Sequence, residues 1–218
     1  MLSDIPTHLI AGPLGAGKTS LLRHLLAQRP ADERWAVLIN EFGQIGLDAA
    51  LLTSTDDGIA LSEVAGGCLC CVNGAPFQIG LARLLRKAKP HRLFIEPSGL
   101  GHPAELLQQL REPPWEGVLA VQPSVLVLDA QALADGQPLP ASQQAALADA
   151  GLLVLNKAEN LDAVQRDALR KRLPDRPLFW TSQGALPVAQ LPGVETQASP
   201  TAGELGVAEG GAVLNSVW

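Results

Sequence analysis

A glycine-rich segment near the N-terminus constrains the fold of this chain more than any other feature. Residues 12–20 read Gly-Pro-Leu-Gly-Ala-Gly-Lys-Thr-Ser, which fits the pattern G-x-x-x-x-G-K-[ST] with one additional glycine. An apolar run that ends at Ala11 precedes the segment, and an amphipathic run that begins at Thr19 follows it. A strand, a glycine-rich turn and a helix in this order predict a phosphate-binding loop.

The rest of the chain continues the same alternation. From Thr7 to about Phe179, short apolar runs alternate with amphipathic stretches, as in α/β folds. The apolar runs are rich in leucine and β-branched residues and lack a polar alternation, which is typical of strands buried on both faces. We therefore predict a P-loop NTPase fold, an α/β fold with a mostly parallel central sheet flanked by helices on both faces. The expected strands are 8–11, 35–40, 92–95, 124–128, 151–155 and 178–180, and the expected helices are 19–27, 77–89, 104–110, 142–150 and 161–173.

The phosphate-binding loop predicts the residues that hold a nucleotide. Glycines let successive N–H groups point at a phosphate, and the following helix N-terminus adds partial positive charge. Lys18 is expected to bridge the β- and γ-phosphates, and the Thr19 hydroxyl to ligate Mg²⁺. The alternative is a strand-to-helix turn without a ligand. The predicted contacts are Gly12, Gly15, Ala16, Gly17, Lys18, Thr19 and Ser20.

A second motif concerns the base. Asn156-Lys157-Ala158-Glu159 follows the apolar run 152–155 and resembles the N-K-x-D guanine-specificity element of GTPases. The carboxylate of that element accepts hydrogen bonds from guanine N1 and the exocyclic amine, which adenine cannot supply. Glu159 is one methylene longer than aspartate, so its carboxylate must approach the base along a different direction. Its discrimination between guanine and adenine could therefore be weaker. We predict a guanine preference, with a polar strand-to-helix loop as the alternative.

All three cysteines of the chain fall within four positions. Cys68, Cys70 and Cys71 follow two glycines, and thiolates at this spacing can converge on one metal and leave a fourth position open. Zn²⁺ is the default for such a site, with Cu⁺ and Co²⁺ as alternatives. The odd, clustered number fits no disulfide framework and indicates a reducing cytoplasm. Buried structural cysteines are the other interpretation.

Charge and hydropathy exclude two classes of partner. The net charge is −6 at pH 7, and the sixteen Lys and Arg residues are scattered, so the chain has no electrostatic footprint for nucleic acid. The N-terminus lacks the pattern of a signal peptide. No uncharged apolar run approaches the roughly 20 residues of a membrane helix. We therefore expect a cytoplasmic protein that binds neither nucleic acid nor membrane.

Four motifs together identify a resemblance to a known family. The phosphate-binding loop, the segment 39–48 (INEFGQIGLD), the cluster 67–71 (GCLCC) and the segment 95–103 (IEPSGLGHP) are similar in order and spacing to the CobW-like metallochaperone GTPases, relatives of HypB and UreG. The likeness covers roughly residues 5–180, and the C-x-C-C cluster is specific to this branch. The resemblance implies hydrolysis of GTP, slow without a partner, and delivery of a bound transition metal to a client metalloprotein or to cofactor synthesis. A homodimer is conceivable.

Three residues are expected to carry catalysis. Glu96 ends a buried apolar run, where a Walker B acid belongs, and would hold Mg²⁺ through water or position the attacking water. Gly99 could offer its N–H to the γ-phosphate, and Lys18 completes the set. Glu41 lies where a first switch is expected, as a candidate ligand for Mg²⁺ or for the transported metal.

The order of the motifs suggests a mechanism. The cysteine cluster lies in the sequence between the Glu41 segment and the segment from Glu96 to Gly99, both of which are expected to contact the γ-phosphate. GTP could thus alter metal affinity, and metal could alter GTP affinity equally. Two alternatives remain: a small-molecule kinase on the same loop, and a GTPase with structural or redox-sensing cysteines. Release of phosphate from GTP without a second substrate would distinguish a GTPase from the kinase, because a kinase needs an acceptor for the phosphate.

The composition changes near residue 180. Residues 181–218 contain no Lys or Arg and are rich in proline and glycine, with too few large apolar residues for a core of their own. We expect 1–180 to form a P-loop GTPase domain with an inserted C-x-C-C metal site. Residues 181–218 are expected to be a tail, or a linker to a domain absent from this chain. The family resemblance implies that such a domain could hold the client-recognition surface.

Overall fold

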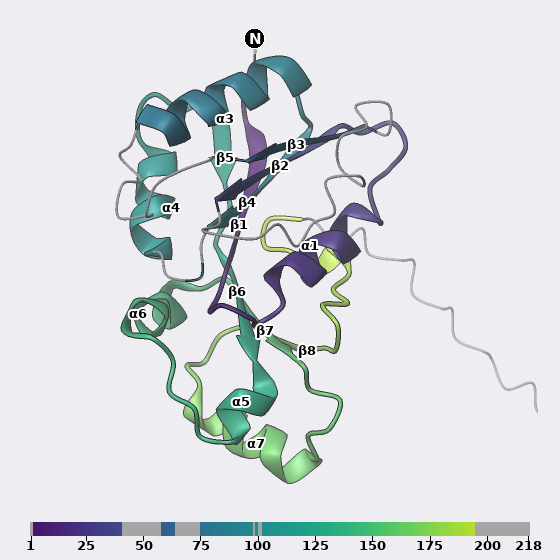
Figure 1. The fold of residues 1–218 in the computed structure, drawn as a ribbon, viewed down its shortest axis with the longest axis vertical. Coiled ribbons are helices and arrows are strands. Elements are labelled where there is room, and N and C mark those ends of the chain that lie inside the picture. Colours follow the sequence, from purple (N-terminus) through teal and green to yellow (C-terminus); the bar gives the residue numbers. More distant parts are fainter. Residues whose placement is uncertain (1, 41–57, 64–74, 98, 100–101, 195–218) are drawn as a thin grey trace, which may run out of the picture.

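A computed structural model describes residues 2–40, 58–63, 75–97, 99 and 102–194 (Figure 1). None of the helices in this described part is long and apolar enough to span a bilayer. The strands are β1 Ile5–Ala11, β2 Trp35–Asn40, β3 Ile59–Glu63, β4 Arg92–Pro97, β5 Leu119–Val121, β6 Val125–Asp129, β7 Leu152–Asn156 and β8 Leu178–Trp180. The helices are α1 Lys18–Leu26, α3 Ala75–Ala88, α4 Pro103–Arg111, α5 Ala130–Ala134, α6 Ala141–Asp149 and α7 Ala163–Arg172, with a short 3-10 turn at Val188–Gln190.

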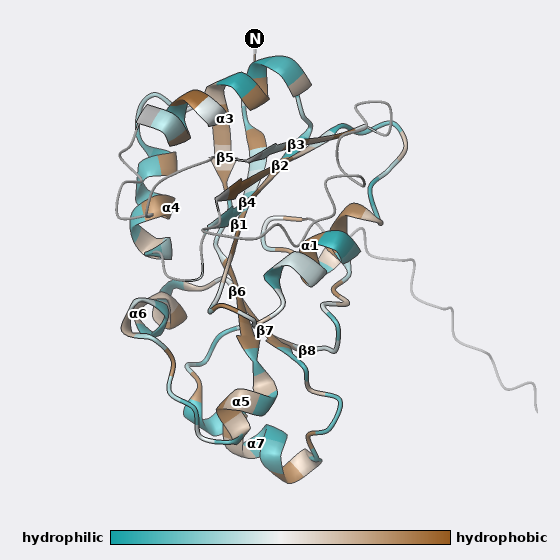
Figure 2. Cartoon of the chain, viewed as in Figure 1, coloured by the Kyte–Doolittle hydropathy of each residue, from teal (hydrophilic) through white to brown (hydrophobic). Residues whose placement is uncertain are grey.

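The described strands form one sheet of eight, and every pairing in it is parallel. The order is β3-β2-β4-β1-β6-β7-β8, with β5 paired to the first residues of β1. Strands buried on both faces need no polar alternation, and β6 and β7 are almost uniformly apolar along their length (Figure 2). The predicted parallel α/β architecture is confirmed.

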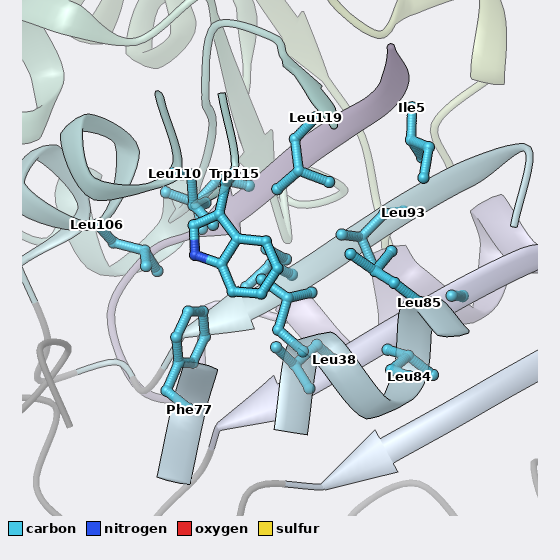
Figure 3. Packing of buried hydrophobic residues seen from close by; sticks show 14 of the residues in the cluster. Ile5, Leu38, Phe77, Leu84, Leu85, Leu93, Leu106, Leu110, Trp115 and Leu119 are labelled. Carbon is cyan, nitrogen blue, oxygen red and sulfur yellow. The ribbon is translucent and has the colours of Figure 1, made fainter. Parts of the chain in front are cut away.

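Neighbouring residues of β1 point to opposite sides of the sheet. Leu9 packs in the cluster under α3 and α4, whereas Ile10 packs in the cluster under α1. Trp115, in the loop after α4, lies among the leucines of the first cluster and beside Phe77 of α3 (Figure 3). Helices therefore cover both faces of the sheet, as predicted.

Residues 181–194 pack on the α1 side of the domain, a contact that their composition did not predict. Leu186 and Leu191 are buried in the same cluster as the leucines of α1. Gln28, next to α1, donates to the carbonyl oxygen of Leu186 at 2.8 Å and accepts from the N–H of Val188 at 3.0 Å. Two leucines on a surface that is already apolar are enough to fix this segment, although they could not form a core alone.

The elements β3, β5 and α5 were not predicted. Each is short: β5 has three residues, and β3 and α5 have five each. The residues of β3 from Ile59 to Ser62 are only half-buried at the edge of the sheet. Segments of this length carry too few periodic positions for a pattern to stand out.

Burial of His8 in β1 makes the stability of the fold sensitive to acid. His8 is fully buried, and its Nε2 lies 2.7 Å from Nη1 of Arg92. Burial, and then the charge of Arg92, lower the pKa of His8 from 6.5 to about 3. Below the unfolded pKa the unfolded chain gains a proton at His8 that the folded chain does not, so falling pH favours unfolding.

We expect this single group to reduce the free energy of unfolding by about 2 kcal/mol between pH 7 and pH 5. A His8→Gln variant keeps a side chain that can accept from Arg92 but cannot titrate. Urea unfolding of both proteins at the two pH values measures the difference, and the carboxylates common to both cancel. Equal losses in the two proteins would contradict the prediction.

Candidate functional site

The predicted nucleotide-binding residues lie together at the carboxyl ends of the parallel strands. The phosphate-binding loop follows β1, Glu96 lies near the end of β4, and Asp129 and Asn156 end β6 and β7. Asp129 and Asn156 are register partners. The carboxyl ends of parallel strands are where α/β folds bind ligands, because the following loops and helix N-termini meet there. The sheet therefore brings together residues that are up to 144 positions apart, from Gly12 to Asn156.

The phosphate-binding loop adopts a conformation that requires its glycines. Gly12, Gly15 and Gly17 have φ values of 145°, 77° and 100°, which side chains rarely adopt. A Cβ on Gly12 would lie 2.1 Å from the carbonyl oxygen of Val127 in β6. Lys18 is 4% exposed, and its Nζ donates to the carbonyl oxygen of Pro13 at 3.1 Å. The ammonium group is thus held over the loop by the chain itself.

A half-buried hydroxyl and a buried carboxylate meet beside this loop. The Thr19 Oγ1 donates to Glu96, at 3.1 Å to Oε1 and 3.5 Å to Oε2, and Glu96 is 1% exposed. Thr19 is in the first turn of α1, and Glu96 is on the neighbouring strand β4. Hard oxygen ligands of this kind, one of them anionic, suit Mg²⁺. The donor set therefore fits a magnesium ion that accompanies a nucleotide.

Gly99 lies against the phosphate-binding loop. A Cβ at this position would be 2.6 Å from the backbone nitrogen of Leu14, so only glycine allows this approach. The carbonyl oxygen of Gly99 accepts from Nε2 of Gln143 in α6 at 3.2 Å. Gly99 is thus placed between the loop and α6, as a backbone group close to where the terminal phosphate of a bound nucleotide is expected.

Asn156 joins the phosphate-binding loop to a second loop. Its Nδ2 donates to the carbonyl oxygen of Ala16 at 2.9 Å, and its Oδ1 accepts from the N–H of Gly184 at 2.9 Å. A Cβ on Gly17 would lie 2.2 Å from the same Nδ2. The side chain of Asn156 is therefore fixed at both ends, and the loop after β8 becomes part of the site.

Lys157 and Glu159 occupy the surface beside Asn156. Lys157 has a positive φ of 58°, and its Nζ pairs with Oδ2 of Asp129 at 2.6 Å. Asp129 also caps α5 by accepting from the N–H of Ala132 at 2.9 Å. Glu159 is exposed. The ion pair holds the lysine stem at the end of β7, while Glu159 is exposed to solvent.

Three residues at this end of the sheet were not predicted from the sequence: Asp129, Gln143 and Gly184. Asp129 follows an apolar run directly, a helix-cap signal that could have been recognised. Gly184 follows the expected strand 178–180 closely, and its position after a strand end was the available signal. Gln143 carried no signal, because nothing in a helix sequence marks the residue that reaches a loop 44 positions earlier.

The predicted metal ligands other than Thr19 lie outside the described residues. Cys68, Cys70 and Cys71 are in the segment 64–74, and Glu41 is in 41–57. Among the residues that the structure does describe, no three His, Cys, Asp or Glu side chains gather as a metal site. The cysteine segment directly precedes α3, and Glu41 directly follows β2.

Comparison with known proteins gives consistent matches. The family model "CobW/HypB/UreG, nucleotide-binding domain" matches residues 6–176. The zinc chaperone YeiR of Escherichia coli is 45% identical over 179 residues, which cover 82% of this chain and 52% of YeiR. The chain thus spans about half the length of that relative.

Two solved structures share the fold. Zn(II)-bound YjiA GTPase from Escherichia coli matches with a TM-score of 0.62 at 23% identity, over 87% of this chain and 61% of that one. HypB from Helicobacter pylori in complex with nickel matches with a TM-score of 0.55 at 18% identity, over 83% of this chain and 80% of that one. These likenesses support the P-loop NTPase fold.

Proposed function

Because the chain belongs to the CobW/HypB/UreG family of nucleotide-binding domains, we propose that it is a GTP-hydrolysing metallochaperone. Its cargo is a transition metal, with Zn²⁺ the first candidate and Co²⁺ the second, held at Cys68, Cys70 and Cys71. The observation that carries the GTPase part is the contact between Thr19 and the buried Glu96 beside a glycine-rich loop. The names of the relatives YeiR and YjiA support zinc.

The described residues suit the two ends of a magnesium nucleotide. Gly12, Gly15, Ala16, Gly17 and Ser20 supply loop and helix N–H groups to the phosphates, in an electrostatic cradle that needs no reorganisation. Lys18 neutralises the β- and γ-phosphates, and Thr19 and Glu96 hold Mg²⁺ directly or through water. Mg²⁺, when bound, neutralises charge that develops on the phosphate oxygens.

Hydrolysis requires an ordered water and a contact to the γ-phosphate. Glu96 is buried at the end of β4 and can orient a water on the phosphate side. The backbone N–H of Gly99 is the proposed switch contact. The product GDP lacks the γ-phosphate, so only GTP engages Gly99.

The base is proposed to bind beside Asn156. Asn156 shapes the pocket through its bonds to Ala16 and Gly184, and the stem of Lys157 offers an apolar surface to the base. The exposed carboxylate of Glu159 accepts from guanine N1 and the exocyclic amine. Its extra methylene leaves discrimination against adenine weaker than an aspartate would give.

Metal delivery forms the second half of the proposal. The cysteine segment lies between β3 and α3, whereas the Glu41 segment lies between β2 and β3. The strand order places β3 beside β2, and β2 beside β4, which bears Glu96. These segments therefore leave neighbouring strands, which supports coupling between metal affinity and nucleotide state. A reducing cytoplasm, a client metalloprotein and a possible homodimer belong to the same proposal.

A zinc competition titration tests this coupling. The reduced protein is titrated once with Mg²⁺ and a non-hydrolysable GTP analogue, and once with GDP. We expect the two zinc affinities to differ by about 5- to 150-fold, the usual range of coupling between sites. Replacement of Cys68, Cys70 and Cys71 by alanine should abolish the difference and leave nucleotide affinity intact. Equal zinc affinities in the two nucleotide states would overturn the metallochaperone proposal and leave a GTPase with a structural metal.

A further inference from the structure

A cavity of about 620 Å³ lies at the end of the sheet opposite the nucleotide-binding residues. Arg34, which precedes β2, and His91, which precedes β4, line it together with Arg86 and Lys89 at the C-terminal end of α3. Asp4, just before β1, is the one carboxylate among the described residues of its wall. The fold thus gathers three cations that are up to 55 positions apart, in a cavity of the size that small molecules occupy.

The guanidinium group of Arg34 is fixed in this wall by the end of α3. Its Nε donates to the carbonyl oxygens of Ala88 and Lys89 at 3.2 and 3.1 Å, and its Nη2 donates to that of Lys89 at 2.8 Å. These hydrogen bonds satisfy carbonyl groups whose partial negative charge would otherwise disfavour an anion. The other edge of the guanidinium group, formed by Nη1 and the second hydrogen of Nη2, can donate to a further acceptor.

His91 places another donor beside that edge. The backbone N–H of Arg34 donates to Nδ1 of His91 at 2.8 Å, so Nδ1 is an acceptor and the ring carries its proton on Nε2. Nε2 lies 3.4 Å from Nη2 of Arg34. Two N–H donors cannot bond each other, so this pair requires a third group that accepts from both. An oxyanion supplies such acceptors and also compensates the positive charge.

We propose that this cavity binds the phosphoryl group of a small phosphate ester. Arg34, Arg86 and Lys89 contribute three positive charges, and none of them forms an ion pair with a described residue. Asp4 offsets one of these charges, which leaves a net charge of about +2. A phosphate monoester carries about −1.5 to −2 at pH 7, whereas a single carboxylate carries only one negative charge. The free edge of a guanidinium group also matches the spacing of phosphate oxygens.

The remaining wall suits the organic part of such a ligand. Leu2 and Pro6 are half-buried and Pro90 is buried, and all three line the same cavity. A phosphoryl group bound at Arg34 leaves most of the volume to a group attached to it, which would pack on these apolar side chains. The site is independent of the proposed GTPase function, because it lies at the amino ends of the strands rather than at their carboxyl ends.

A titration followed by two-dimensional ¹H–¹⁵N NMR tests the site. The protein is first saturated with GDP and Mg²⁺, so that the phosphate-binding loop is occupied, and is then titrated at constant ionic strength with sodium phosphate, phenyl phosphate or acetate. We expect a Kd of about 1 mM for phosphate, as a few charge-assisted hydrogen bonds open to solvent can provide. Phenyl phosphate should bind about fivefold more tightly, through burial of about 40 Å² of apolar surface. Acetate should bind at least about tenfold more weakly than phosphate.

Three substitutions locate the binding. His91→Asn keeps an oxygen that can accept from the Arg34 N–H but removes the Nε2 donor, and should raise the Kd of phosphate about fivefold. Arg86→Gln should raise it about threefold, whereas Arg83→Gln, the same change at an exposed residue of α3 outside the cavity wall, should leave it unchanged. Asp4→Asn removes the opposing carboxylate and should lower the Kd about twofold.

Each outcome bears on the proposal. Shifts of the backbone resonances of Arg34, Lys89 and His91, together with the expected order of the variants, support the phosphate ester site. Equal effects of Arg86→Gln and Arg83→Gln, or an unchanged Kd in His91→Asn, would show that phosphate only screens surface charge and would overturn it. Acetate binding as tight as that of phosphate would overturn the phosphoryl assignment, and phenyl phosphate binding no tighter than phosphate would overturn the assignment of an ester.

Discussion

Replacing Glu96 by glutamine is expected to lower the rate of GTP hydrolysis by about 100-fold or more. The substitution keeps the shape of the side chain and an oxygen that can accept from Thr19, whose hydroxyl lies 3.1 Å from Oε1. It removes the negative charge, which in a position only 1% exposed cannot be replaced by solvent. Magnesium and the attacking water then lose the group that is proposed to orient them. Affinity for GDP should change by less than about threefold, because the loop glycines and Lys18 supply most contacts to its phosphates.

Single-turnover hydrolysis, followed by phosphate release with GTP alone, measures this effect even if the basal rate is low. Glu105→Gln is the matched control, since Glu105 is exposed in the first turn of α4 and makes the same change of charge away from the site. Its rate should equal that of the wild type. A Glu96→Gln variant that hydrolyses GTP normally would reduce Glu96 to a structural partner of Thr19.

The second large effect concerns stability, and Gly12 carries it. Gly12→Ala would place a Cβ 2.1 Å from the Val127 carbonyl oxygen, in a backbone conformation with φ of 145°. The carbonyl group belongs to β6, a strand in the interior of the sheet, and cannot move aside without breaking that sheet. We expect the free energy of unfolding to fall by about 3–5 kcal/mol, the range of severe steric and strain effects.

Gly15→Ala is the comparison that isolates the clash. Gly15 also has a positive φ, of 77°, but a Cβ there meets nothing within 4 Å. Conformational strain alone should cost about 1–2 kcal/mol. Urea unfolding of the two variants, with unchanged m-values, gives the comparison. If both variants lose the same amount, the approach of Gly12 to Val127 contributes nothing to stability.

Local patterns predicted the architecture well where a pattern is long enough. The strand expected at 35–40 matches β2, and the helix expected at 161–173 contains α7. The family resemblance drawn from four motifs is confirmed by the match over residues 6–176. Composition could not predict the packing of residues 181–194, because burial of Leu186 and Leu191 depends on a surface formed by α1. Local propensity carries no information about a packing partner that is about 160 positions away in the sequence.

The candidate site was likewise predicted in part from local motifs and depends in part on the fold. The roles of Thr19 and Glu96 were predicted from the phosphate-binding motif and from the end of an apolar run. Their hydrogen bond depends on the fold, because the parallel sheet brings the two residues together. The bond between Asn156 and Gly184 needed the fold, since two loops at different strand ends must first be brought together. The roles of Cys68, Cys70, Cys71 and Glu41 stay predictions from sequence.

Asn156 has a consequence for how a ligand is held. One side chain fixes a carbonyl group of the phosphate loop and an amide of the loop after β8. The two loops are therefore mechanically coupled, because displacement of either loop strains a hydrogen bond to the same Asn156 side chain. A purine seated at one half would stiffen the other half without touching it. A bound nucleoside and a bound phosphate chain would then favour each other beyond the covalent bond that links them.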